Sequence, residues 1–281
     1  MENLSAFCAP GASVEERMID IADGVSLRLI TFTPAEDKGT PPVLFVAGWI
    51  SLIVGWKDVL REMTKDFTVY YIETREKISS RIKKRTNQSV QAIGGDIVAL
   101  TEQLKLESSG YILLGSSLGG TAILDCCRHL TLNPGCLVLI EPNAEFRVPK
   151  TWKLIVNTFY PGLFIVLKPV VKWYLRTFRL NVEADPAQYA KYCNALDAAD
   201  PWKLKRAVKS LWGYEVWNLL EEIDIPTLIL NASEDKLHEP ENLRKIADIM
   251  PDAELLDMET NKQTHSASMV DELRKYLSRI P

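Results

Sequence analysis

The sequence has few of the residues from which metal centres and disulfide frameworks are built. It contains five cysteines, and their spacing matches no metal-ligand pattern. The odd cysteine count, together with an N-terminus that lacks a basic and apolar leader, predicts a cytoplasmic protein without a signal peptide. The pair Gly94-Gly95 lies in a helical pattern and forms no phosphate loop. We therefore expect neither a metal nor a cofactor.

Strong net charge and long apolar runs are also missing. The net charge of −4 gives no global preference for nucleic acid, so no nucleic-acid partner is expected. The nearest candidate for a membrane span, residues 160–175, is interrupted by prolines and lysines and is interpreted as lid or surface helices. What remains is a chain of 281 residues, enough for one large α/β domain with an insertion or for two small domains.

Short apolar runs recur along the chain and predict a parallel sheet. Each run is continuous rather than alternating, which indicates burial on both faces between layers of helices. Ahead of them, Arg17–Ile21 and Ser26–Phe32 flank Asp23-Gly24, which predicts an antiparallel hairpin. The later predicted strands are Val43–Ala47, Val69–Ile72, Tyr111–Leu114, Leu137–Ile140, Thr227–Leu230 and Ala253–Met258, and helical stripes run through 93–104, 243–250 and 270–277.

Ser117 stands in the pattern Gly-x-Ser-x-Gly, Gly115–Gly119, between a predicted strand and a helical stretch. The two glycines allow a sharp bend without a Cβ clash, and the bend exposes the serine hydroxyl. In a strand–turn–helix context this pattern is a nucleophile elbow. On this evidence the chain, from about Arg17 to Ile280, resembles the capped α/β-hydrolases, which include esterases, lipase-like enzymes and thioesterases. The resemblance implies a mostly parallel eight-stranded sheet flanked by helices.

A serine hydroxyl is a poor nucleophile at neutral pH and needs a base to remove its proton. The chain has three histidines. His129 follows the elbow and is interpreted as structural, and His238 is interpreted as a capping or surface residue. His265 lies in a polar loop between the last predicted strand and the last predicted helix, where the resemblance implies the catalytic histidine.

The histidine needs a carboxylate that fixes its tautomer and stabilises the imidazolium. Asp235 follows a predicted strand, and the order Ser117, Asp235, His265 is the order of the fold. Glu234 is one residue short of the usual place. Glu141, at the tip of the preceding strand, is the main alternative, because some members of the fold carry their acid there.

The resemblance also implies an oxyanion hole made of backbone amides. One donor is expected to be the N–H of Leu118, and the other the N–H of Trp49 in the loop Ala47–Ser51. The family's loop usually begins His-Gly, whereas this chain has Ala47-Gly48. In the family this loop histidine supports the neighbouring backbone. Ala47 cannot supply that support, although the amide donors remain.

A second loop matches the family in part. Glu73, Arg75 and Ser79 align with the pattern Asp-x-Arg-Gly-x-Gly-x-Ser, a loop that orders the floor of the site. Glu76 and Ile78 replace the usual glycines, so the backbone of this loop must differ from the family's.

Residues 141–222 interrupt the alternation of strands and helices. The resemblance implies that they form a helical cap inserted between strands 6 and 7, and that 1–140 and 223–281 form the core domain. The cap's aromatic residues are expected to build its own core and its seam with the main domain, and together an apolar roof over the site. They are Trp152, Phe159, Phe164, Trp173, Tyr174, Trp202, Trp212 and Trp217.

These features predict a serine hydrolase that cleaves an ester or thioester with a hydrophobic part through an acyl-enzyme on Ser117. Acyltransfer or C–C bond hydrolysis by the same triad, or a non-catalytic α/β-hydrolase-like binding protein, are the alternatives. The basic run 75–85 is interpreted either as a solvated loop or as a patch for an anionic headgroup. With the apolar segment 160–175, it makes contact between the cap and a membrane surface a hypothesis.

Overall fold

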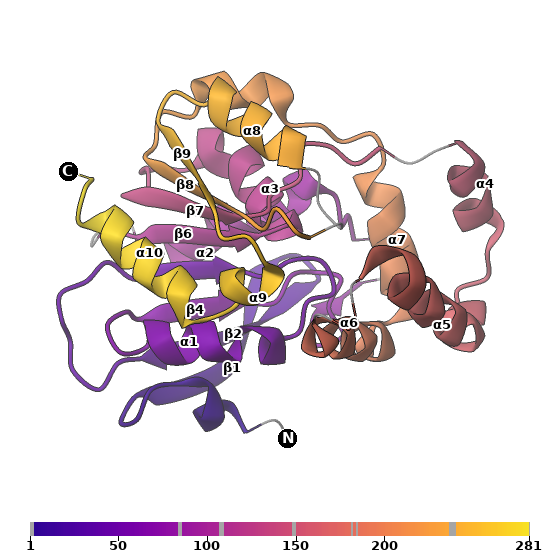
Figure 1. Ribbon diagram of the computed structural model, residues 1–281, viewed down its shortest axis with the longest axis horizontal. Coiled ribbons are helices and arrows are strands. Elements are labelled where there is room, and N and C mark those ends of the chain that lie inside the picture. Colours follow the sequence, from indigo (N-terminus) through magenta and orange to yellow (C-terminus); the bar gives the residue numbers. More distant parts are fainter. Residues whose placement is uncertain are drawn as a thin grey trace.

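The computed structural model describes residues 3–83, 86–106, 110–147, 150–180, 182–183, 185–235 and 240–280. Within them a nine-stranded sheet runs in the order β1-β2-β4-β3-β6-β7-β8-β9, and β5 pairs with β2 (Figure 1). The pairs from β4 through β9 are parallel, and those that involve β2 are antiparallel. The strands are β1 (Ser13–Ala22), β2 (Val25–Thr33), β3 (Val43–Val46), β4 (Val69–Ile72), β5 (Arg81–Ile82), β6 (Ile112–Ser116), β7 (Cys136–Ile140), β8 (Thr227–Asn231) and β9 (Ala253–Asp257).

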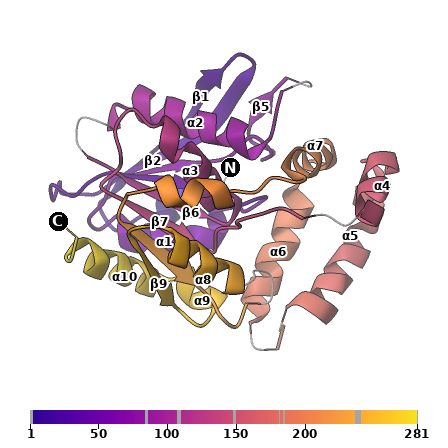
Figure 2. The same ribbon diagram turned by 90° about the horizontal axis from the view of Figure 1, so that it is seen from above.

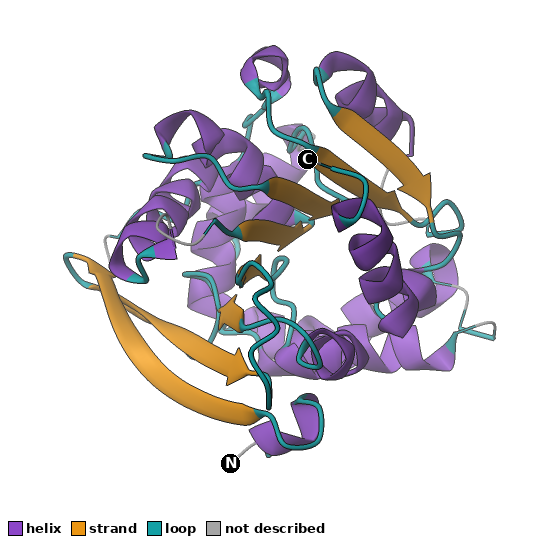
Figure 3. Ribbon diagram, turned by 90° about the vertical axis from the view of Figure 1, so that its left-hand side faces the viewer, coloured by secondary structure: helices purple, strands orange, loops and turns teal. Residues whose placement is uncertain are grey.

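Helices cover both faces of this sheet, with the β1–β2 hairpin curving away at one edge (Figure 3). Buried side chains of α2, α3 and α8 form the core on one face, and those of α1 and α10 form it on the other. The main-domain helices are η1 (Leu4–Phe7), η2 (Ile53–Trp56), α1 (Lys57–Met63), α2 (Val90–Gln103), α3 (Leu118–Cys126), η4 (Cys127–His129), α8 (Pro240–Ile249), α9 (Asn261–Thr264) and α10 (Ala267–Leu277).

The predicted sheet is confirmed, since the strands that follow the hairpin lie within two residues of the expected ends. The hairpin is confirmed as well, with Arg17 opposite Leu29 and a positive φ of 69° at Gly24. Several short elements were not predicted, among them β5, which has only two residues, and the helix α1.

Between β7 and β8 the chain forms helices instead of strands. Four of these helices stand together on one side of the sheet in two perpendicular views, namely α4 (Lys150–Thr158), α5 (Leu163–Tyr174), which the π-helical turn η5 (Leu175–Arg179) continues, α6 (Pro186–Ala198) and α7 (Pro201–Leu211) (Figures 1 and 2). The last turn, η6 (Trp217–Glu222), packs against α3 and α8 of the main domain. Among the described residues, no helix is long and apolar enough to cross a bilayer.

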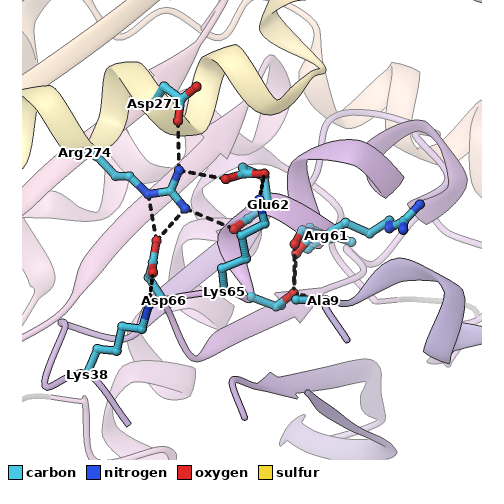
Figure 4. Close-up of polar contacts among 10 residues, drawn as sticks. Ala9, Lys38, Arg61, Glu62, Lys65, Asp66, Asp271 and Arg274 are labelled. Carbon is cyan, nitrogen blue, oxygen red and sulfur yellow. Dashed lines mark hydrogen bonds and ion pairs between the residues drawn. The ribbon is translucent and has the colours of Figure 1, made fainter. Parts of the chain in front are cut away.

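An arginine on α10 ties this last helix to α1 (Figure 4). The Arg274 guanidinium donates from Nε to Asp66 Oδ2 at 2.7 Å and from Nη1 to Glu62 Oε1 at 2.9 Å. It also binds Asp271 within α10, and Lys38 adds an ion pair to Asp66 at 3.0 Å. One cation thus joins three carboxylates on two segments that are far apart in the sequence.

Arg274→Ala is expected to lower the free energy of unfolding by about 2 kcal/mol, because it removes several charged hydrogen bonds at a partly buried position. Urea denaturation measures the change. Lys275→Ala is the matched control, because its ammonium is exposed and pairs with Glu272 inside the same helix. Equal losses in the two variants would contradict the role assigned to Arg274.

Candidate active site

Ser117 occupies a strained turn at the carboxyl end of β6. Its φ of 47° and ψ of −115° lie in a region that residues with a Cβ rarely adopt, and its N–H donates to Ile140 O at 2.8 Å. A Cβ added at Gly119 would lie 2.2 Å from Val46 O, and one at Gly115 would lie 2.7 Å from Gly120 N. Both glycines are therefore required by close backbone approach, which is the physical reason for the pattern read in the sequence.

Asn143 holds the Ser117 hydroxyl, a contact that sequence reasoning missed. Its Nδ2 donates to Ser117 Oγ at 2.9 Å. The backbone of Asn143 is clamped to α3, because Thr121 Oγ1 accepts from Asn143 N at 3.1 Å and donates to Asn143 O at 2.8 Å. Since Asn143 occupies a lone pair of Oγ, the hydroxyl proton is left to point toward another acceptor. The only local signal was its place just after β7, at the edge where the elbow lies.

His265 follows α9, and its ring is fixed from two sides. Nδ1 lies 2.9 Å from Asn261 O and 3.0 Å from Thr264 Oγ1. A carbonyl oxygen can only accept, so the neutral ring carries its proton on Nδ1 and its lone pair on Nε2. Trp56 stacks on the imidazole, with ring centroids 4.1 Å apart, and its own Nε1 donates to Ser51 Oγ. Nε2 is thereby the nitrogen available to act as a base.

Asp235 reaches this histidine through an intermediate residue. Its Oδ2 accepts from Asn261 Nδ2 at 3.2 Å and from Gln188 Nε2 at 3.3 Å. The same Asn261 supplies the carbonyl that contacts Nδ1, so one asparagine links the acid and the histidine.

Glu141, the main alternative for the acid, lies at the cavity itself. It is 2% exposed at the end of β7, with a positive φ of 48°, and it lines the same cavity as Ser117 and His265. Of the three acids weighed from the sequence, Asp235 and Glu141 are therefore at or next to the site, whereas Glu234 is exposed. Of the other two histidines, His129 is exposed away from the cavity, and His238 lies outside the described residues.

The cavity shared by these residues has a volume of about 300 Å³. Its floor comes from the main domain, and its roof from α5, η5 and α6. The roof combines the aliphatic side chains of Val171, Leu175, Ala195 and Leu196 with Lys191 and Tyr192, and the described aromatic residues that the sequence analysis named are not part of the lining. The lining residues are Gly48–Leu52, Trp56, Ser116, Ser117, Glu141, Asn261 and His265 from the main domain, and Val171, Leu175, Lys191, Tyr192, Ala195 and Leu196 from the cap helices.

The two expected oxyanion donors flank Ser117. Leu118 is the first residue of α3, so its N–H has no acceptor within the helix. Trp49 lies in the opposite loop, which approaches closely enough that a Cβ added at Gly48 would be 3.4 Å from Ser117 Cβ. Lys77 Nζ donates to Gly48 O, and this bond braces the loop at the place where the family's histidine is missing.

The first basic residues of the run 75–85 point into the protein instead of into solvent. Arg75 and Lys77 are 7% and 4% exposed, and Arg75 grips Asp96 with bonds of 2.6 and 2.7 Å. From α7, Lys203 Nζ donates to Lys77 O at 2.5 Å. Both the solvated-loop and the anionic-patch interpretation are therefore wrong for Arg75 and Lys77. Lys84, with its neighbour at position 85, lies outside the described residues.

A cap lysine enters the site from α6. Lys191 Nζ donates to Asn261 Oδ1 at 2.7 Å, one helical turn after Gln188, which binds Asp235. Burial lowers the pKa of Lys191 to about 8, against the opposing effect of the Asp235 and Glu141 carboxylates. Burial likewise raises the pKa of the neighbouring phenol of Tyr192. Helix α6 is thus bonded to both the acid and the histidine loop.

The lowered pKa of Lys191 predicts a pH-dependent stability. Between about pH 8 and the ordinary value of 10.5, the unfolded state binds more protons at this residue than the folded state. The free energy of unfolding of the wild type should therefore rise relative to Lys191→Met as the pH increases through this window. Urea titrations at several pH values measure the difference. Lys245→Met, at an exposed position on α8, is the control and should show no such trend; a flat difference for Lys191→Met would refute the assignment.

The residues named so far give no site for a metal. Within the described ranges, no three or more His, Cys, Asp or Glu side chains are grouped so that they could hold an ion. All five cysteines are free thiols, and four of them are buried.

This fold and this elbow are those of the α/β-hydrolases. A family model described as serine aminopeptidase, S33, matches residues 42–262, and the chain belongs to this family of α/β-hydrolase enzymes. No curated protein matches the sequence.

Similar solved structures include a hydrolase from Pseudomonas aeruginosa PA01, with 17% identity, a TM-score of 0.76, and coverage of 94% of this chain and 97% of that chain. A thermophilic esterase from Thermogutta terrifontis has 19% identity and a TM-score of 0.74, with 95% and 99% covered. Esterase RhEst1 from Rhodococcus sp. ECU1013 has 18% identity and a TM-score of 0.75, again with 95% and 99% covered. At these identities the likeness extends to the fold alone.

Proposed function

We propose that the chain is a serine hydrolase that cleaves a carboxylic ester or thioester with a hydrophobic acyl or alcohol part. The observation that carries the proposal is the shared cavity, which Ser117 and His265 line together. The serine stands on a strained elbow, and the Asn261 carbonyl at Nδ1 of His265 places the lone pair of the neutral ring on Nε2. The aliphatic side chains of the cap supply an apolar wall for the substrate.

In the proposed reaction, His265 Nε2 removes the proton of Ser117 Oγ while Oγ attacks the acyl carbonyl. The negative charge that develops on the carbonyl oxygen is stabilised by the N–H groups of Leu118 and Trp49. The imidazolium then protonates the leaving alcohol or thiol, and water releases the acyl group by the reverse sequence. Stacking of Trp56 on the ring favours the charged imidazolium, because the face of an indole attracts cations.

Asp235 is the proposed acid of the site, acting on His265 through Asn261. Its negative charge stabilises the imidazolium across that residue, while the Asn261 carbonyl fixes the tautomer. Glu141 is the alternative, because it lines the cavity itself. Transfer of the acyl group to an alcohol would use the same acyl-enzyme, and product analysis with an added alcohol separates transfer from hydrolysis.

A fluorophosphonate probe is expected to label Ser117, and Ser117→Ala should lose labelling and lower ester hydrolysis by about 1,000-fold or more. Peptide mapping by mass spectrometry identifies the adduct. Circular dichroism establishes that the variant is folded, and Ser268→Ala on α10 is a matched control that should keep full activity. Wild-type hydrolysis by Ser117→Ala would overturn the proposal, and failure of the folded wild type to react would favour a non-catalytic binding protein.

Asp235→Asn is expected to lower kcat by about 100-fold or more, because the uncharged amide no longer stabilises the imidazolium. Glu141→Gln should have the smaller effect. Steady-state kinetics of the two isosteric variants on one ester measure both. The reverse ranking would transfer the role of the acid to Glu141.

A further inference from the structure

Helix α5 and the turn η5 that continues it present apolar side chains both to the site cavity and to solvent. No residue in either element is fully buried. Val171 and Leu175 line the site cavity. Val171 also lines a second, more open cavity of about 260 Å³ between α4, α5 and α7, to which Phe159 and Phe164 contribute. Helix α5 therefore lines both of these cavities.

The outer face of the same helix is a stripe of exposed apolar side chains. The stripe repeats every three or four residues, which places its members on one side of the helix. Apolar patches of this extent on a folded chain mark contacts with a partner or a membrane. Its members are Leu163, Val166, Val170, Trp173, Tyr174 and Phe178, which are 49%, 72%, 56%, 57%, 47% and 58% exposed.

The segment that carries this stripe is cationic. Residues 150–180 contain six lysines and arginines and neither aspartate nor glutamate, in a chain whose net charge is −4. Lys168 Nζ donates to the backbone carbonyl of Asp197 on α6 at 2.8 Å and Lys172 pairs with its carboxylate at 2.7 Å, whereas Arg176 is exposed on η5. Apolar and aromatic side chains on one face of a cationic helix are typical of helices that lie in the interface of anionic lipid bilayers.

We propose that the outer face of α5 and η5 docks on an anionic lipid surface. Because the inner face of this helix lines the site cavity, docking would set that cavity directly above the lipid, and the substrate would be an ester or thioester with a lipid-soluble chain. This reading of the substrate rests on the proposed hydrolase function. A second copy of the chain is a poorer occupant, because a two-fold contact between caps would set one cationic segment against the other.

Co-sedimentation with vesicles tests the docking. The wild type should bind phosphatidylcholine vesicles that contain about 30 mol% phosphatidylserine, and should bind pure phosphatidylcholine vesicles much more weakly, with binding that falls as salt rises. The double variant Val166→Glu/Trp173→Glu should lower the partition coefficient by about tenfold or more. Leu132→Glu, at a position of similar exposure (54%) in the main domain, should bind like the wild type.

Hydrolysis of a short, soluble ester separates this proposal from the function on which its substrate rests. The double variant should retain wild-type activity on that ester, because its substitutions point away from the cavity. Absence of vesicle binding by the wild type, or unchanged binding by the double variant, would overturn the docking. A concentration-dependent dimer without vesicles that the double variant abolishes would assign the face to a second copy instead. Vesicle binding by a protein inactive on every ester would leave the docking standing and refute the hydrolase.

Discussion

The close approach of α3 to β3 is the constraint on which the site depends. An ideal Cβ built on Gly119 would lie only 2.2 Å from Val46 O. Any side chain at this position would therefore prevent α3 from packing this closely on β3. The helix would then move outward, and the positive φ of Ser117 would relax to a common conformation. The strain is held by bonds on both sides, since Ser117 N donates to Ile140 O and Ser117 O accepts from Thr121 N at 3.0 Å. Backbone packing, rather than any charged group, thus sets the position of the serine.

Asn261 positions His265 as the packing of α3 on β3 positions Ser117. Its carbonyl contacts His265 Nδ1, its Nδ2 donates to Asp235, and its Oδ1 accepts from Lys191 of the cap. The orientation of the imidazole is therefore coupled to the position of α6. A movement of that helix would break the bond from Lys191, and with it one of the restraints on the residue that fixes the tautomer. Helix α6 is thus part of the arrangement that orients the proposed base.

The sequence predicts well what depends on local physics. Continuous apolar runs locate the strands because burial on both faces leaves no room for polar side chains, and the elbow is found because only glycine tolerates the approach at Gly115 and Gly119. Asn143 and Lys77 escape notice, since they reach Ser117 and Gly48 across 26 and 29 residues. The link through Asn261 depends on a backbone carbonyl, and a carbonyl has no signature in a sequence.

The cap was the hardest part to predict, for a related physical reason. Aromatic content says that a helix has an apolar side, but not which way that side faces. The sequence places Trp173 and Tyr174 in the cap's own core or in its seam with the main domain, whereas both are exposed. The cations of the basic run are misplaced in the opposite direction. Arg75 and Lys77 point inward, where Arg75 binds Asp96 and Lys77 binds the Gly48 carbonyl of the oxyanion loop. Arg176, by contrast, is exposed on the segment that carries the apolar stripe of α5, which argues that the proposed lipid contact belongs to this segment.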